Sequence, residues 1–181
     1  MPRFELSESV QLRPLEDADV NELSELIERN RDHLARWMPW AQDQTREGTL
    51  AFIRGTKRKV EAGEGLELCV IEDGAIAGMV GLHLAEPDNH GGRIGYWLGE
   101  DRQGRGLMTR AVATLLSHAF GELALNRVEI RAAPDNARSR AIPEGLGFVE
   151  EGLLREAERF GDEYRDSVVY SMLARDWAER A

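Results

Sequence analysis

The sequence predicts a single domain of the α/β (α+β) class, with a mixed central sheet of about seven strands flanked by about four helices. The 181 residues are enough to bury one sizeable core and few for two, so we expect residues 1–181 to form one domain. Strand signals come mostly in hairpins, with one strand–helix–strand crossover. Because hairpins pair antiparallel strands and a crossover pairs parallel ones, the sheet should contain both arrangements.

The first third of the chain predicts one strand and two helices. Residues 10–15 alternate apolar and polar side chains, which is typical of a strand. A helix capped by Asp17 or Asp19 should follow. Its apolar stripe consists of Val20, Leu23, Leu26 and Ile27. Pro39 interrupts the next stretch, and a second helix is expected from Thr45 to Ala62, before Gly63.

The rest of the chain predicts six further strands and two helices. Two apolar runs within residues 66–84 flank Asp73-Gly74, a strong hairpin signal. The remaining elements, in order, are a strand, a helix, a strand, a helix and two strands, near residues 93–99, 107–120, 126–134, 137–148, 149–158 and 164–174.

Composition narrows the class of protein. A formal net charge of −10 argues against nucleic acid as a partner and suits a basic one, such as an amine or a Lys/Arg-rich protein. The single cysteine, Cys69, excludes an internal disulfide. The N-terminus does not resemble a signal peptide, and no apolar run has the length of a membrane span. We therefore expect a cytoplasmic protein that contacts no membrane and, because its four histidines have no metal-ligand spacing, binds no metal.

The stretch EDRQGRGLMTRA, residues 100–111, lies between a predicted strand and a predicted helix. It has neither the spacing of a nucleotide P-loop nor the third glycine of a dinucleotide fingerprint. One remaining interpretation is a glycine turn whose backbone N–H groups, at the helix N-terminus, bind a pyrophosphate with help from nearby arginines. The other is a plain turn with solvated arginines, and this stretch alone does not decide between them.

This stretch contains the first of three motifs that occur in a fixed order along the chain. Gln103-x-x-Gly106-x-Met108 is followed by Asn136-Ala-Arg-Ser139 and by Gly147-Phe148. With these motifs the chain resembles the GNAT (Gcn5-related) N-acetyltransferase superfamily, in its ribosomal-protein serine/alanine N-terminal acetyltransferase branch. The resemblance runs from residues 12–20, through the Trp-rich residues 33–40, to the last strand. Met108 departs from the family pattern, which has a small residue there.

The resemblance implies a GNAT fold, whose sheet is splayed near its middle to admit acetyl-CoA as co-substrate. The strand from Gly95 to Leu98 would pair with the pantetheine arm, and a backbone amide there would polarise the thioester carbonyl. The glycine turn would bind the pyrophosphate. The cofactor-binding positions carried over from the family are Trp97, Leu98, Gln103, Gly104, Arg105, Gly106, Leu107, Met108, Thr109 and Asn136.

The resemblance also implies the catalytic and acceptor residues. Glu158 matches the family's general base, although alternation along a strand would put Glu156 on the same face, so the two roles could be exchanged. Ser139 is the candidate acid toward the CoA sulfur, and its ordinary role would be a helix cap. Three aromatic residues either line the acceptor site or belong to the core: Trp37, Trp40 and Tyr164.

The implied reaction is acetyl transfer from acetyl-CoA to a primary amine, with a protein N-terminus, such as that of a ribosomal protein, as the expected acceptor. The alternatives are a small amine, namely a polyamine, an aminoglycoside or an amino acid, and a non-catalytic acyl-CoA-binding domain. Relatives in this branch often form dimers, so a homodimer is a further expectation from the resemblance.

Overall fold

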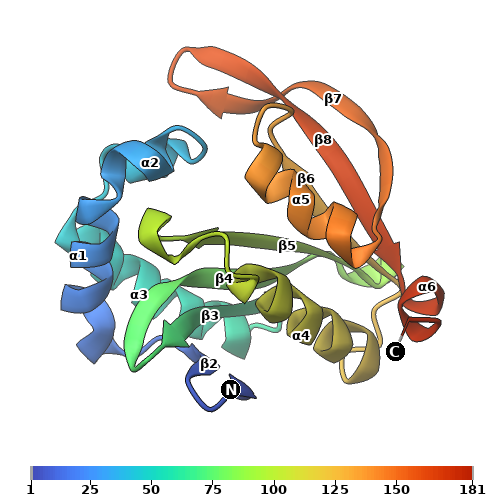
Figure 1. Ribbon diagram of the computed structural model, residues 1–181, viewed down its shortest axis with the longest axis horizontal. Helices are drawn as coiled ribbons and strands as arrows, with labels where there is room; N and C mark the ends of the chain where they lie inside the picture. Colours follow the sequence, from blue (N-terminus) through green and yellow to red (C-terminus); the bar gives the residue numbers. More distant parts are fainter. Residues whose placement is uncertain (1, 181) are drawn as a thin grey trace.

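One eight-stranded mixed sheet organises residues 2–180, the part of the chain that the computed structural model describes (Figure 1). Its strand order is β1-β2-β3-β4-β5-β6-β8-β7, and only the β5–β6 pair is parallel among the pairs in this part of the chain. The strands are β1 (Phe4–Ser7), β2 (Val10–Pro14), β3 (Gly65–Glu72), β4 (Ala75–Glu86), β5 (Gly91–Leu98), β6 (Arg127–Ala132), β7 (Val149–Phe160) and β8 (Glu163–Leu173).

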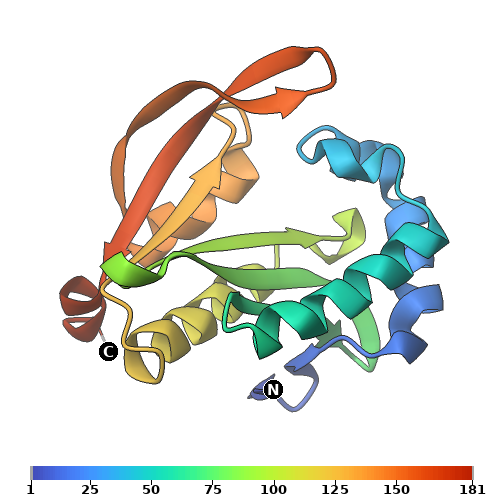
Figure 2. The same ribbon diagram turned by 180° about the vertical axis from the view of Figure 1, so that it is seen from behind.

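Helices cover both faces of the sheet (Figures 1 and 2). The longer ones are α1 (Val20–Arg29), α3 (Arg46–Glu61), α4 (Leu107–Gly121) and α5 (Ala137–Leu146). The short ones are α2 (Arg31–Ala35), α6 (Ala174–Ala178) and the 3-10 turns η1 (Asp17–Asp19), η2 (Pro39–Ala41), η3 (Pro87–Asn89) and η4 (Glu100–Arg102). One apolar cluster lies between α4 and the sheet, and a second joins α1 and α3 to the opposite face.

The predicted class, a mixed sheet with flanking helices, is confirmed, and the expected numbers of strands and helices are too low. Strand β1 was not predicted because it has only four residues, although Phe4 and Leu6 alternate and pack against the core. Helices α2 and α6 have five residues each, too few to show a helical period. The Asp73-Gly74 hairpin is confirmed, with φ values of 52° and 81° at the two turn residues.

The sheet opens between β5 and β6. Their parallel pairing covers four residue pairs and ends at Ile94↔Ile130. Strand β5 nevertheless continues to Leu98, and β6 to Ala132. Beyond Ile94, β5 therefore has a free hydrogen-bonding edge facing β6, which is the splay that the resemblance implies.

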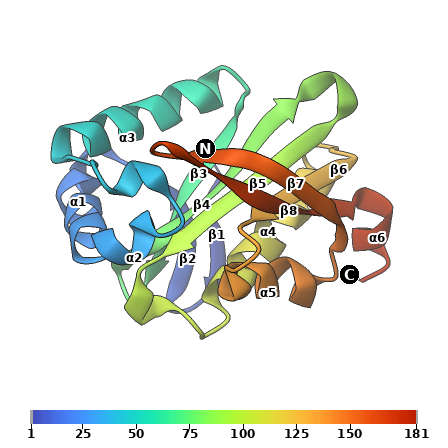
Figure 3. The same ribbon diagram turned by 90° about the horizontal axis from the view of Figure 1, so that it is seen from above.

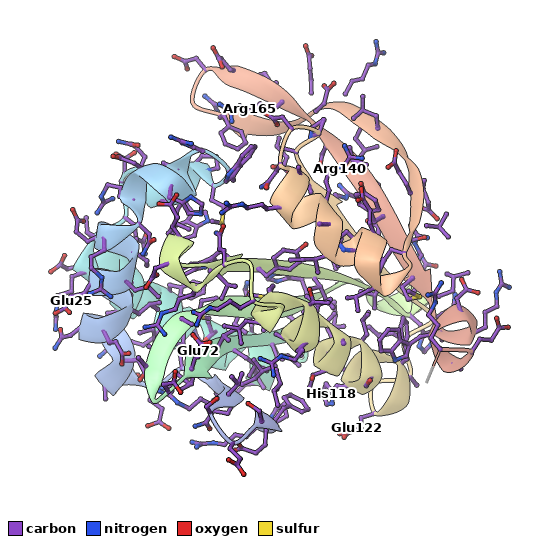
Figure 4. The ribbon with its side chains drawn as sticks, viewed as in Figure 1. Glu25, Glu72, His118, Glu122, Arg140 and Arg165 are labelled. Carbon is purple, nitrogen blue, oxygen red and sulfur yellow. The ribbon has the colours of Figure 1, made fainter. Side chains whose placement is uncertain are left out.

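The β7–β8 hairpin extends past the rest of the sheet, and its tip reaches over β5 toward α2 (Figures 1 and 3). At the tip Arg165, on β8, donates a hydrogen bond of 2.8 Å to the backbone carbonyl of Arg36, just after α2 (Figure 4). The Arg165 guanidinium also lies 4.0 Å from the centre of the Phe160 ring. These contacts tie the last hairpin to the Trp-rich segment near the start of the chain.

Candidate active site

The glycine turn presents unpaired backbone donors at the start of α4. Gly104 and Gly106 have left-handed φ values of 77° and 69°, which glycine adopts without strain, and a Cβ on either would meet no atom within 4 Å. The first backbone hydrogen bond of the helix runs from the amide of Arg110 to the carbonyl of Gly106. The amides of residues 104–109 thus have no acceptor within the described chain and can bind an anion.

Met108, the residue that departs from the family pattern, does not obstruct this turn. Its side chain is buried in the core between α4 and the sheet, as is that of Leu107. At these two positions the side chains point into the core, so the solvent-facing side of the turn presents only backbone amides to a ligand.

The arginines around the turn are largely paired within the protein. Arg102 and Arg105 both donate to one carboxylate oxygen of Glu72, at 3.0 and 2.9 Å, and Glu72 is buried at the end of β3 (Figure 4). One of the two sequence interpretations has these arginines helping to bind a pyrophosphate, and the other leaves them solvated. In this structure both arginines hold the turn against β3, and the carboxylate of Glu72 partly neutralises their charge.

Gln103 connects three parts of the site. Its Nε2 lies 2.8 Å from His33 Nε2 on α2 and 3.4 Å from the carbonyl oxygen of Leu98. Its Oε1 accepts a hydrogen bond of 2.8 Å from Arg138 on α5. One side chain thus spans the distance from α2, past the end of β5, to α5.

The start of α5 brings Asn136 and Ser139 next to β5. The Asn136 side chain caps the helix by accepting from the amide of Ser139 at 3.2 Å, so the helix cap is Asn136 and not Ser139. The Ser139 hydroxyl donates to the Tyr96 hydroxyl at 3.3 Å, and Tyr96 donates to the Ser139 carbonyl at 3.0 Å. Burial raises the pKa of Tyr96 to about 12, so this phenol is neutral at physiological pH.

The β7–β8 hairpin separates the two candidate bases. Leu154 pairs with Ser167 and Glu158 with Arg165, so three residues of β7 lie opposite one residue of β8. Glu156 lies in this bulge with a φ of 52°, and its amide donates to Asp166. The expectation that alternation puts both glutamates on one face is therefore wrong. Glu158 Oε1 instead accepts from the buried Ser167 hydroxyl at 3.4 Å.

The aromatic candidates come from two parts of the chain, the Trp-rich segment and the β7–β8 hairpin. Trp40, 43% exposed, has its ring centre 6.1 Å from that of Trp97 on β5, so these two residues are together. Trp37 is half-buried in the same segment. Tyr164 is 58% exposed near the hairpin tip, where it pairs with Arg159. The Arg165 contact with Arg36 brings the hairpin tip to the segment that carries both tryptophans.

Sequence reasoning missed Glu72, Tyr96, His33 and Arg138. Their contacts join residues 30 to 70 positions apart, and no local motif marks them. Only Tyr96 had a usable signal, because alternation along β5 puts it on the strand face opposite Trp97, toward the helix that carries Ser139.

The residues present fit an extended ligand with an anionic end. The free edge of β5 offers backbone groups to an amide-containing arm, and the amides of residues 104–109 offer donors to a pyrophosphate. Among the described side chains of residues 2–84 and 88–180, no group of three or more His, Cys, Asp or Glu is placed to hold a metal. In the same part of the chain no helix is long and apolar enough to cross a membrane.

Comparison with known proteins matches this geometry. A model of the acetyltransferase (GNAT) domain family matches residues 9–149. A putative ribosomal N-acetyltransferase of Bacillus subtilis is 37% identical over 174 residues, 95% of each chain. The ribosomal-protein-serine acetyltransferase of Escherichia coli is 29% identical over 171 residues, 94% of this chain and 96% of that one.

A solved structure adds a ligand to the comparison. The ribosomal L7/L12 alpha-N-protein acetyltransferase in complex with coenzyme A superposes with a TM-score of 0.89, at 26% identity, covering 95% of this chain and 98% of that one. The family match spans most of the chain and includes the splayed strand and the glycine turn. The chain therefore belongs to the GNAT acetyltransferase family and is an N-acetyltransferase whose acetyl donor is acetyl-CoA.

Proposed function

We propose that this enzyme acetylates the α-amine at the N-terminus of a protein, such as a ribosomal protein. The observation that carries the proposal is similarity over nearly the whole chain to a putative ribosomal N-acetyltransferase, at 37% identity, and to a ribosomal-protein-serine acetyltransferase, at 29% identity. The net charge of −10 supports it, because ribosomal proteins are mostly basic and an acidic enzyme attracts them.

On the donor side, backbone groups do most of the binding. The amides of residues 104–109 bind the pyrophosphate of acetyl-CoA, and the edge of β5 from Gly95 to Leu98 hydrogen-bonds the pantetheine arm. The amide of Trp97 or Leu98 polarises the thioester carbonyl. Gln103 keeps the turn in register with β5 through its bond to the Leu98 carbonyl.

On the acceptor side, Glu158 takes a proton from the attacking amine. A free α-amine has a pKa of roughly 7.7–8.0 against roughly 10.4 for lysine, so a carboxylate removes its proton at much lower cost. As the N–C bond forms and the C–S bond breaks, the departing thiolate takes a proton from the Ser139 hydroxyl, which is reprotonated from water while Glu158 releases its proton to water. Tyr96 positions that hydroxyl through the two hydrogen bonds between them.

The hairpin and the Trp-rich segment form the place for the acceptor chain. Trp37 and Trp40 lie on one side, and Tyr164 lies on the hairpin that contacts the same segment. Aromatic rings give a flexible peptide apolar contact area at small entropic cost, which suits recognition of an N-terminus.

The test uses labelled acetyl-CoA and two peptides that share one sequence containing a lysine. The first peptide has a free N-terminus, and the second is N-terminally acetylated, so that only its lysine is free. We expect label on the first peptide alone. A panel of a polyamine, an aminoglycoside and free amino acids is run in parallel. Label on one of these small amines, with none on the free N-terminus, would refute the proposed acceptor.

A further inference from the structure

A nearly buried carboxylate lies on the sheet face that carries Trp97, which is the face opposite Tyr96 and Ser139. Glu67, on β3, has a side chain only 11% exposed, and its Oε1 lies 3.2 Å from Nε2 of His83, which is 40% exposed. Burial raises the pKa of Glu67 to about 7, and the charge of Lys59 on α3 acts in the opposite direction. The reaction described above makes no use of this pair.

The two strand positions in line with Glu67 carry no side chain, because both are glycines. Glu67 pairs with Gly81 on β4, and Gly81 pairs with Gly95 on β5, so the three residues form one row across the sheet. The Glu67 carboxylate occupies the place that a Cβ on Gly81 would fill. Gly95 is exposed, and a Cβ there would meet only His83 Nε2, at 4.0 Å.

The row ends at β5, the strand proposed to hydrogen-bond the pantetheine arm of acetyl-CoA. Gly95 is the first residue of β5 beyond its last pair with β6, so it lies where the sheet opens. Trp97, two residues along the strand, shares its face with Gly95 and has Trp40 beside it. The open space above Gly95 is therefore bordered by an imidazole, an acidic side chain and an aromatic ring.

We propose that Glu67, His83 and the bare surface of Gly95 form a binding site for the primary ammonium group of the acceptor. This site deepens the proposed function and rests on it. Cβ positions of directly opposed strand residues lie about 4.5–5.5 Å apart, so a nitrogen resting on Gly95 is about 5 Å from the carboxylate above Gly81. At that distance, in a partly desolvated place, an ammonium ion is attracted by the carboxylate and by the face of Trp97.

The charges facing the pair determine how binding depends on pH. Burial lowers the pKa of His83, and the charges of Lys59 on α3 and Arg93 on β5 lower it further, which favours the neutral imidazole. A cation on Gly95 favours the ionised form of Glu67. Affinity for an ammonium ion should therefore rise as the pH increases from about 6 to about 8, while an alkylammonium, with a pKa near that of lysine at roughly 10.4, keeps its charge throughout.

The experiment titrates the CoA-bound enzyme with propylammonium and follows backbone amide shifts by NMR. We expect saturable shifts at Gly95 and Gly81, tighter binding at the higher pH, and no saturable shifts with 1-propanol. Glu67→Gln should weaken binding about tenfold or more, since it removes the charge. Glu64→Gln, which changes an exposed carboxylate three residues away, should bind as the wild type does.

Gly95→Ala is a second, independent variant. The position does not need a left-handed φ and has room for a methyl group, so the protein should keep its melting temperature while the ammonium site is filled. Propylammonium that shifts no amide at Gly95, or that binds Glu67→Gln as tightly as the wild type, overturns the proposal. This titration measures binding and needs no acetyl transfer. Its result is therefore independent of the peptide test of the proposed acceptor.

Discussion

Replacing Gly106 with alanine tests whether the glycine turn binds the diphosphate of CoA through its amides. Gly106 has a φ of 69°, and an added Cβ would meet no protein atom within 4 Å. The substitution therefore causes no clash inside the protein, and its cost to the fold is the strain of a left-handed alanine, about 1–2 kcal/mol. The new methyl group projects from the turn whose amides are proposed to approach the diphosphate.

A matched control exists in the β7–β8 turn. Gly161 has a φ of 61°, and a Cβ there would likewise meet nothing within 4 Å. Gly161→Ala should therefore cost the fold the same strain, far from the start of α4. For a chain of this size, a loss of about 1 kcal/mol lowers the melting temperature by about 2–4 °C in each variant.

The two variants should differ in CoA binding. A hydrogen bond to a charged group contributes about 1.5–3 kcal/mol, so loss of one amide–phosphate bond raises Kd about tenfold to a hundredfold in Gly106→Ala. Gly161→Ala should bind CoA as the wild type does. Calorimetric titration with CoA measures Kd, and thermal unfolding measures stability. Equal CoA affinity in the two variants, with equal loss of stability, would refute the assignment of these amides to the diphosphate.

Three further substitutions test the rest of the site. Ser139→Ala should lower kcat about a hundredfold at unchanged acetyl-CoA affinity, and steady-state kinetics that show an unchanged kcat would remove its acid role. Glu158→Gln should lower kcat by a similar factor across the pH range, while Glu156→Gln stays near the wild type; the reverse result would exchange the two roles. Glu72→Gln should cost about 1–2 kcal/mol of unfolding free energy in a urea titration, because two arginines lose their charged acceptor. An unchanged midpoint would show that these ion pairs are too exposed to matter.

The backbone conformation on the donor side could be predicted from the sequence because short local patterns determine it, while its assignment to acetyl-CoA depended on the family resemblance. Asp-Gly places the β3–β4 turn, and two glycines with left-handed φ values make the turn before α4. Asn136 caps α5 three residues before Ser139, and the spacing of this motif is enough to identify it. In each case the physical cause acts within a few residues, so one segment of sequence contains it.

The acceptor side could not be predicted in the same way, because its parts meet only after the chain has folded. The bulge that moves Glu156 away from Glu158 breaks the strict alternation on which the sequence argument depended. The contact of Arg165 with the Arg36 carbonyl joins the last hairpin to the Trp-rich segment, and no pattern in either segment predicts the other.

Gly95 is the residue at which these two sides meet. It is the first residue of β5 beyond the last pair with β6, and its bare Cα faces the surface that Glu67 and His83 border. A side chain at this position would leave the strand edge intact, since the hydrogen-bonding groups of a strand point sideways and its side chains point to the faces. Donor binding and acceptor binding are therefore separable at one residue, and Gly95→Ala should leave CoA affinity unchanged while it weakens the binding of an ammonium ion.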